Sequence, residues 1–121
     1  MREEAMMRVY VPDSGLEATL SIVDPDTGVN YAQDFIGNAG ALSDGQFVFS
    51  EEHGAYLCSS ETLEWWVEVL EEYQALEDRI HSLERMHGWE RVQRVLDEVP
   101  AADLEDYPGR ANTALDKEFG Q

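Results

Sequence analysis

The sequence contains a single cysteine, Cys58, among its 121 residues. One thiol cannot form an intramolecular disulfide, so a disulfide framework is excluded and a reducing compartment is the default. No apolar run is long enough for a membrane-spanning helix, and the first residues are too charged for a secretory signal. We therefore expect a cytoplasmic protein.

Basic residues are also scarce. Eight Lys and Arg face 26 Asp and Glu, which gives a net charge of -18 and a pI near 4.2. This charge excludes nucleic acid and anionic membrane as direct ligands and favours association with basic surfaces. A halophilic source would produce the same acidity, so composition leaves that alternative open. The hydrophobic content of 43% argues against disorder, and the length fits a single domain of residues 1–121.

The longest periodic stretch covers residues 60–87 and predicts one long helix. Ser60 can cap its first turn, and Gly88 can adopt the left-handed conformation that ends many helices. Apolar residues recur at steps of three and four, which places them on one stripe. This core or dimer stripe comprises Trp66, Val69, Tyr73, Leu76, Ile80 and Leu83.

A second set of positions on the same helix is acidic, and no Lys or Arg precedes Arg79 within it. Like charges at steps of three and four repel each other, so a helix selected only for stability would intersperse Lys. We interpret this acidic face as a partner-binding surface, although a merely solvated face would have the same pattern. Together with Trp65, which does not fit the core stripe, the predicted partner-binding residues are Glu61, Glu64, Glu68, Glu71, Glu72 and Asp78.

The remaining chain predicts an α+β fold, in which an N-terminal antiparallel sheet of hairpins packs against the long helix and a shorter C-terminal helix. Alternating and β-branched residues predict the strands, and Asp24 to Gly28 predict a hairpin turn. The expected parts are a loose start at 1–5, strands at 7–11, 16–22, 29–35, 46–50 and 55–59, a loop at 37–45, and a helix at 89–99. Residues 7–59 thus form the β-rich part, 60–99 the helical part, and 100–121 an acidic segment with a poorly ordered tail.

Chemistry-bearing motifs are weak, and we expect no catalytic residue, metal or cofactor. Asp24, Asp26 and Gly28 resemble the opening of a calcium loop, but Val29 and Phe35 stand where Gly and Glu are needed. Two acid–histidine pairs at a spacing used by di-metal proteins, Asp78 with His81 and Glu84 with His87, lie on one helix and diverge. Cys58 is expected in a buried strand rather than as a nucleophile.

The stripe also predicts a homodimer. A helix of 28 residues is about 40 Å long, whereas short strands measure roughly 17–20 Å, so one small sheet cannot cover the stripe. A second copy of the chain could cover the remainder.

In charge, size and acidic helix the chain resembles small acidic inhibitors encoded by phages and plasmids, namely antirestriction DNA mimics and some anti-CRISPR proteins. The segment from Arg8 to Val11 is similar to the first strand of antirestriction mimics. The resemblance implies a non-enzymatic inhibitor that occupies the basic nucleic-acid-binding surface of a host nuclease or CRISPR effector, in the host cytoplasm. The alternative is a non-catalytic interaction or oligomerisation module whose acidic surface serves only solubility.

Overall fold

The computed structural model describes residues 7–120, and the chain divides into two compact units, Met1–Glu71 and Glu72–Gln121. The division falls within the long helix α2 (Ser60–His87), so this helix contributes to both units. The single domain of residues 1–121 stays a prediction, and each of the two units has its own core. The loose start expected at residues 1–5 lies outside the described residues.

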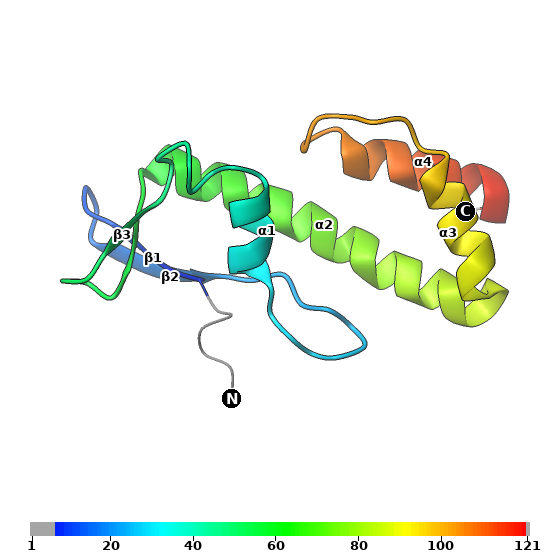
Figure 1. Cartoon of the computed structure of the whole chain (residues 1–121), viewed down its shortest axis with the longest axis horizontal. Coiled ribbons are helices and arrows are strands. Elements are labelled where there is room, and N and C mark those ends of the chain that lie inside the picture. Colours follow the sequence, from blue (N-terminus) through cyan, green and yellow to red (C-terminus); the bar gives the residue numbers. More distant parts are fainter. Residues whose placement is uncertain (1–6, 121) are drawn as a thin grey trace. The chain divides into compact units, whose positions relative to one another are not determined.

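The first unit contains a four-stranded sheet, formed by two antiparallel hairpins (Figure 1). The strand order is β2-β1-β4-β3, and β1 and β4 pair in parallel, with Val9 opposite Tyr56. The sheet is therefore mixed rather than purely antiparallel, while the predicted α+β class is confirmed. The bounds are β1 (Met7–Val11), β2 (Leu16–Leu20), β3 (Val48–Ser50) and β4 (Ala55–Leu57).

The strands differ in how they divide their side chains between core and solvent. In β1 the residues Met7, Val9 and Val11 are buried at every second position, as expected for a strand with one face in the core. In the edge strand β3, in contrast, Val48 and Phe49 remain 56% and 54% exposed. An apolar edge strand is thus present at the surface of the first unit.

The prediction of a returning strand at 29–35 is wrong, because helix α1 (Ala32–Asn38) begins there. The turn itself forms as expected: the amide of Gly28 donates to the carbonyl of Asp24 at 2.8 Å. After Asn30 the chain enters α1 instead of a strand. The Oδ1 atom of Asn30 accepts hydrogen bonds from the amides of both Ile22 and Ala32. The expected loop at 37–45 consequently starts later, after α1.

Helix α2 has the predicted bounds, but a different residue caps it. The hydroxyl of Ser59, not of Ser60, accepts a hydrogen bond from the amide of Thr62 at 3.1 Å. This bond satisfies one of the first-turn donors that lack a partner within a helix. At the other end Gly88 has φ of +97°, which L side chains rarely adopt, so the chain can turn directly into α3 (Trp89–Asp97).

Trp66 lies at the centre of the first unit's core and is 2% exposed. Its ring contacts those of Phe35 and Phe47 with centroid separations of 6.4 Å and 6.2 Å. Its indole N–H donates to Oε1 of Gln46 at 2.9 Å, so the polar atom of this buried ring has a partner. Residues from α1, from the segment before β3 and from α2 therefore meet at one side chain.

The second unit has a separate, helical core. Leu76 and Leu83 of α2 are buried together with Val92 of α3 and with Ala111 and Leu115 of helix α4 (Tyr107–Phe119). The prediction of a poorly ordered tail in this region is therefore wrong. Pro108 and Gly109 suggested a break, but proline fits the first turn of a helix, where its missing N–H is not needed.

Charged side chains of the second unit connect its helices. Arg79 of α2 donates to Asn112 Oδ1 at 2.7 Å and forms an ion pair with Asp116 of α4. Arg91 of α3 pairs with Glu118 of α4 at 3.0 Å. These cations therefore have carboxylate partners within their own unit.

None of the helices among residues 7–120 combines the length and the apolar character needed to cross a membrane.

Tyr73 provides a test of this core. Its hydroxyl donates to the carbonyl of Leu104 at 2.7 Å. Burial, assisted by the nearby Tyr107 and Glu72, raises the pKa of Tyr73 to about 12 from its usual value of 10. Because the folded state favours the neutral phenol, the associated stability is fully present below pH 10 and is lost as the pH rises from 10 to 12.

The substitution Tyr73→Phe is therefore expected to lower the free energy of unfolding by about 1 kcal/mol at pH 7, since one hydrogen bond is lost. It should also make the alkaline decline in stability between pH 10 and 12 less steep. Urea denaturation at a series of pH values measures both effects. An alkaline decline that is unchanged in the variant would contradict the role assigned to Tyr73.

Candidate acidic binding surface

The carboxylates of the predicted acidic face all point to solvent. At about 100° per residue, the six positions fall within an arc of roughly 120° on α2, away from the buried stripe. Glu61, Glu64, Glu68 and Glu71 belong to the first unit, while Glu72 and Asp78 belong to the second. The exposed residues of this face are Glu61, Glu64, Glu68, Glu71, Glu72 and Asp78.

The two units differ sharply in charge. No Lys or Arg occurs between Arg8 and Arg79, so residues 1–71 contain 14 acidic residues and two arginines, whereas residues 72–121 contain 12 and six. Within the described part of the first unit, the ion pair of Arg8 with Glu17 spans 4.0 Å between exposed side chains. The first half of the acidic face therefore has no neutralising cation beside it in sequence. This asymmetry can be seen in the sequence itself.

The density of charge along α2 is comparable with that of a nucleic acid strand. Five carboxylates from Glu61 to Glu72 span roughly 17 Å at 1.5 Å per residue, or about one charge per 3–4 Å. A single DNA strand carries about one charge per 3.4 Å of helix axis, and the duplex carries about one per 1.7 Å. The face therefore matches one strand in linear charge density, but not the duplex.

A hollow of about 290 Å³ lies beside the first turn of α2, and no sequence pattern predicted it. Its walls include Glu61, Trp65 and Gln46. Trp65 is 36% exposed, and its ring meets that of the buried Trp66 edge-on at 5.0 Å. An exposed aromatic surface next to a carboxylate is a combination that accommodates Lys or Arg side chains.

The apolar stripe of α2 is covered within the chain. Trp66 and Val69 are buried in the first unit, and Leu76 and Leu83 in the second. The two remaining positions, Tyr73 and Ile80, are partly buried, and Ile80 packs against the core of the second unit. The homodimer stays a prediction, but the uncovered stripe from which we inferred it does not exist in this structure.

The residues that could have carried chemistry have structural roles. The Cys58 thiol is buried, which raises its pKa and keeps it as the unreactive thiol. His53 stacks on Tyr10 with ring centroids 4.4 Å apart, and His87 stacks on Phe119 at 4.5 Å. The side-chain contacts of these three residues are those of packing groups.

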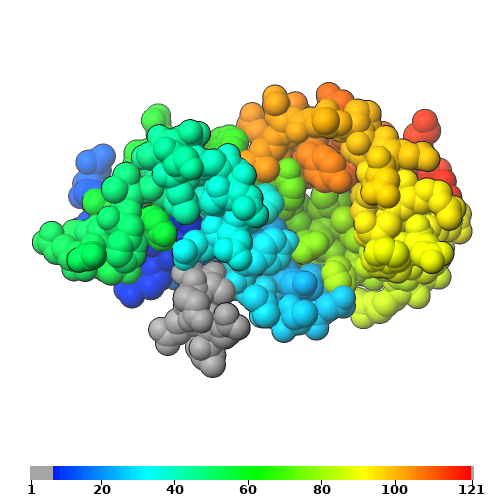
Figure 2. Space-filling view, viewed as in Figure 1, coloured from blue at the N-terminus to red at the C-terminus, as the bar shows by residue number. Residues whose placement is uncertain are grey.

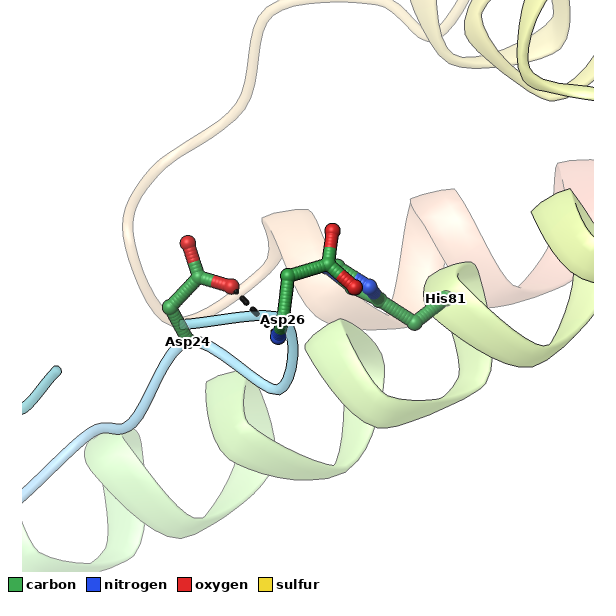
Figure 3. Close-up of side chains that lie close together, drawn as sticks. All are labelled: Asp24, Asp26 and His81. Atoms are coloured by element: carbon green, nitrogen blue, oxygen red, sulfur yellow. Dashed lines mark hydrogen bonds between the residues drawn. The ribbon is translucent and has the colours of Figure 1, made fainter. Parts of the chain in front are cut away.

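The Asp24 to Gly28 segment is a turn in the first unit. The amide of Asp26 donates to Oδ1 of Asp24 at 2.8 Å, as Figure 3 shows, so this carboxylate stabilises the turn from within. His81, which Figure 3 also draws, lies on α2 in the second unit. The turn interpretation thus accounts for the residues that resemble the opening of a calcium loop.

Comparisons of the chain with protein-family models, with curated protein sequences and with solved structures find no significant match.

Proposed function

We propose that this protein is a non-catalytic inhibitor whose acidic face occupies the basic nucleic-acid-binding surface of a nuclease or CRISPR effector. The observation that carries the proposal is the uncompensated charge of α2. Its carboxylates are exposed, and the unit that contains most of them has two arginines against 14 acidic residues. A surface of Lys and Arg that normally contacts phosphates would meet carboxylates at the spacing of one strand.

The geometry of α2 favours binding without large rearrangement. Because the opposite side of the helix is buried in each unit, the backbone that carries the carboxylates is already folded before a partner binds. Preorganised charges lose little conformational freedom on association, and complementary charge speeds the encounter. The hollow beside Trp65 adds a place for one Lys or Arg side chain of the partner, since both Trp65 and Glu61 line it.

The alternative function, that of an oligomerisation module, lacks comparable support. Its main argument was an apolar stripe left uncovered by the sheet, and that stripe is buried within the chain. Self-association would also bring two chains of net charge -18 together, which electrostatic repulsion opposes.

The proposal is tested by competition with DNA. The immobilised protein is incubated with cell extract at low salt, retained proteins are eluted with a salt gradient, and each is titrated with labelled duplex and single-stranded DNA. We expect at least one retained nucleic-acid-binding protein to release its DNA as our protein is added, with the effect weakening as salt rises.

Two results would count against the proposal. One is that the retained proteins bind DNA equally well with and without our protein. The other is competition that does not depend on salt, since contacts made by exposed carboxylates are screened at high ionic strength.

A further inference from the structure

The first unit leaves one edge of its sheet open at strand β3. Within the described part of this unit, the strand order β2-β1-β4-β3 gives β3 a neighbouring strand on one side only. Figure 2 shows the hairpin of β3 and β4, in green, at the surface. The main-chain amides and carbonyls along the outer side of an edge strand are available to another strand, so β3 can accept one.

Strand β3 lacks the charged side chains that usually protect an edge. Both Val48 and Phe49 are more than half exposed, and Ser50 is the only polar residue of the strand. The strand at the opposite edge, β2, instead carries the exposed Glu17, which pairs with Arg8. Because sheet edges are commonly blocked by charge, the apolar and uncharged edge of β3 indicates a surface that is used for binding.

A hollow of about 490 Å³ adjoins this edge. Val48 and Leu57, which lie opposite each other in the register of β3 with β4, line it together with Gln46 and Thr62. Asp13, from the turn between β1 and β2, is the one charged side chain among the described residues that line the hollow. A cationic side chain that enters here therefore meets a carboxylate.

The opposite face of β3 is aromatic. Successive side chains of a strand point to opposite faces, so Phe49 lies on the side away from Val48. Its ring meets that of Tyr56 on β4 edge-on, with the ring centroids 5.2 Å apart. The edge thus presents an aromatic surface on one face and a hollow with a carboxylate on the other.

Acidic side chains flank β3 at both ends. Asp44 precedes the strand, and Glu51 and Glu52 lie in the turn that follows it; all three are exposed. Among the described residues of the first unit, Arg8 is the only Lys or Arg, and it lies on β1, which β4 separates from β3. The charge beside this edge therefore favours a cationic ligand.

Two other groups near the edge do not reverse this preference. The N-terminus of α2 reaches the hollow and would attract an anion, but the hydroxyl of Ser59 already accepts a hydrogen bond from the amide of Thr62 there. His53, in the turn after β3, stacks on Tyr10 and does not line the hollow.

We propose that β3 binds an extended peptide segment, in which Lys or Arg alternates with apolar residues, as a fifth strand of the sheet. Main-chain hydrogen bonds to β3 hold the segment, which is a common way of binding peptides at a sheet edge. On one face its cationic side chains cross Val48 and reach Asp13, while on the other its apolar side chains pack against Phe49 and Tyr56. The acidic face of α2 takes no part, so this inference does not rest on the function proposed above.

The charge of the protein argues against the other occupants of an open edge. A second copy of the chain would bring another net charge of -18 to the edge. Nucleic acid and anionic membrane would be repelled in the same way. A basic peptide is attracted instead, and its backbone supplies the donors and acceptors that an edge strand pairs with.

The probe for the test is a synthetic peptide of about ten residues with alternating lysine and valine, which is long enough for one strand. It is titrated into the full-length protein and followed by calorimetry and amide NMR. We expect saturable binding of one equivalent, with shifts centred on residues 46–57 and slower hydrogen exchange of the β3 amides that face away from β4.

N-methylation of alternate peptide amides separates strand pairing from simple attraction between charges. Alternate amides of a strand point to opposite sides, so methylation of one set should weaken binding roughly tenfold or more, while methylation of the other set should change it little. Both methylated peptides keep every charge and every side chain of the parent peptide.

The double variant Val48→Thr with Phe49→Thr should lower the affinity for the peptide roughly tenfold, because it removes apolar surface while keeping a residue that favours strands. Its matched control is Leu16→Thr with Val29→Thr, which changes two other exposed apolar residues of the same unit and should leave the affinity unchanged.

The carboxylate at the hollow has its own test. Asp13→Asn should weaken peptide binding several-fold, whereas Asp34→Asn, which neutralises an exposed carboxylate on α1, should not. The two variants have the same net charge, so any difference between them reports the position of the carboxylate.

Four results would each overturn the proposal: no saturable binding, equal affinities of the two methylated peptides, equal losses in the two double variants, or shifts centred on residues 61–72 of α2. Circular dichroism checks each fold, and a double variant that unfolds is replaced by its single substitutions. The peptide test needs no nuclease and the DNA competition needs no peptide, so failure of one is distinguished from failure of the other.

Discussion

Reversal of Glu64, Glu68, Glu71 and Glu72 to Lys is expected to weaken partner binding roughly 100-fold or more at low salt while leaving the fold intact. All four side chains are exposed on α2, and exposed substitutions usually change stability by no more than about 0.5 kcal/mol each. Against a basic surface, each reversal replaces attraction with repulsion, which slows association and weakens the complex. The effect should shrink at 0.15 M salt, where the Debye length is about 8 Å instead of about 30 Å at 0.01 M.

The matched control reverses Asp13, Asp44, Glu51 and Glu52, which are exposed in turns and loops of the first unit. It makes the same change in net charge, so it separates the acidic face from the overall charge of the protein. The measurement is a binding titration of wild type and both variants against the protein that releases its DNA. An equal loss of affinity in both variants would show that the effect depends only on net charge. Unchanged affinity of the α2 variant at both salt concentrations would show that α2 is not the binding surface.

Trp66→Ala is expected to destabilise the first unit by about 3–5 kcal/mol, which is the usual cost of removing a large aromatic side chain from a core. The side chain is 2% exposed and contacts the rings of Phe35 and Phe47, so its removal leaves a cavity between three elements. Total stabilities are typically about 5–15 kcal/mol, so the variant should lose a large part of the stability of this unit.

The neighbouring substitution Trp65→Ala is the control, since Trp65 is 36% exposed and should cost far less. Thermal melting by circular dichroism compares the two variants. Amide hydrogen exchange then shows where protection is lost, and we expect the loss in β1–β4 rather than in α3 and α4, whose core includes Leu83 and Leu115. Equal melting temperatures for the two variants would show that the core of the first unit does not depend on Trp66.

The sequence predicted the long helix well because its signals are local. Apolar residues from Trp66 to Leu83 repeat at helical spacing, and Gly88 supplies a backbone conformation that other residues rarely adopt. The strands β1 and β2 could likewise be predicted, because apolar and polar residues alternate in them. The parallel pairing of β1 with β4 could not be predicted, because it joins residues that are distant in sequence and depends on how the hairpins assemble.

Two helices were missed for identifiable reasons. In α1, Ala32 and Ile36 are buried four residues apart, but the preceding hairpin turn suggested a returning strand. In α4, Pro108 and Gly109 looked like breakers, although Ala111, Leu115 and Phe119 repeat every four residues and could have indicated the helix. A hollow of about 600 Å³ beside α4 could not have been predicted either, since its lining combines Pro100 with residues of a helix that was not expected.

The acidic charge of the chain has a further consequence at the edge strand β3. Val48 and Phe49 are largely exposed there, and an apolar strand edge can pair with the edge of another molecule. At neutral pH, mutual repulsion between highly charged chains keeps such edges apart; near the pI of 4.2 that repulsion disappears. The carboxylates that we assign to partner recognition therefore also maintain the colloidal stability of the concentrated protein.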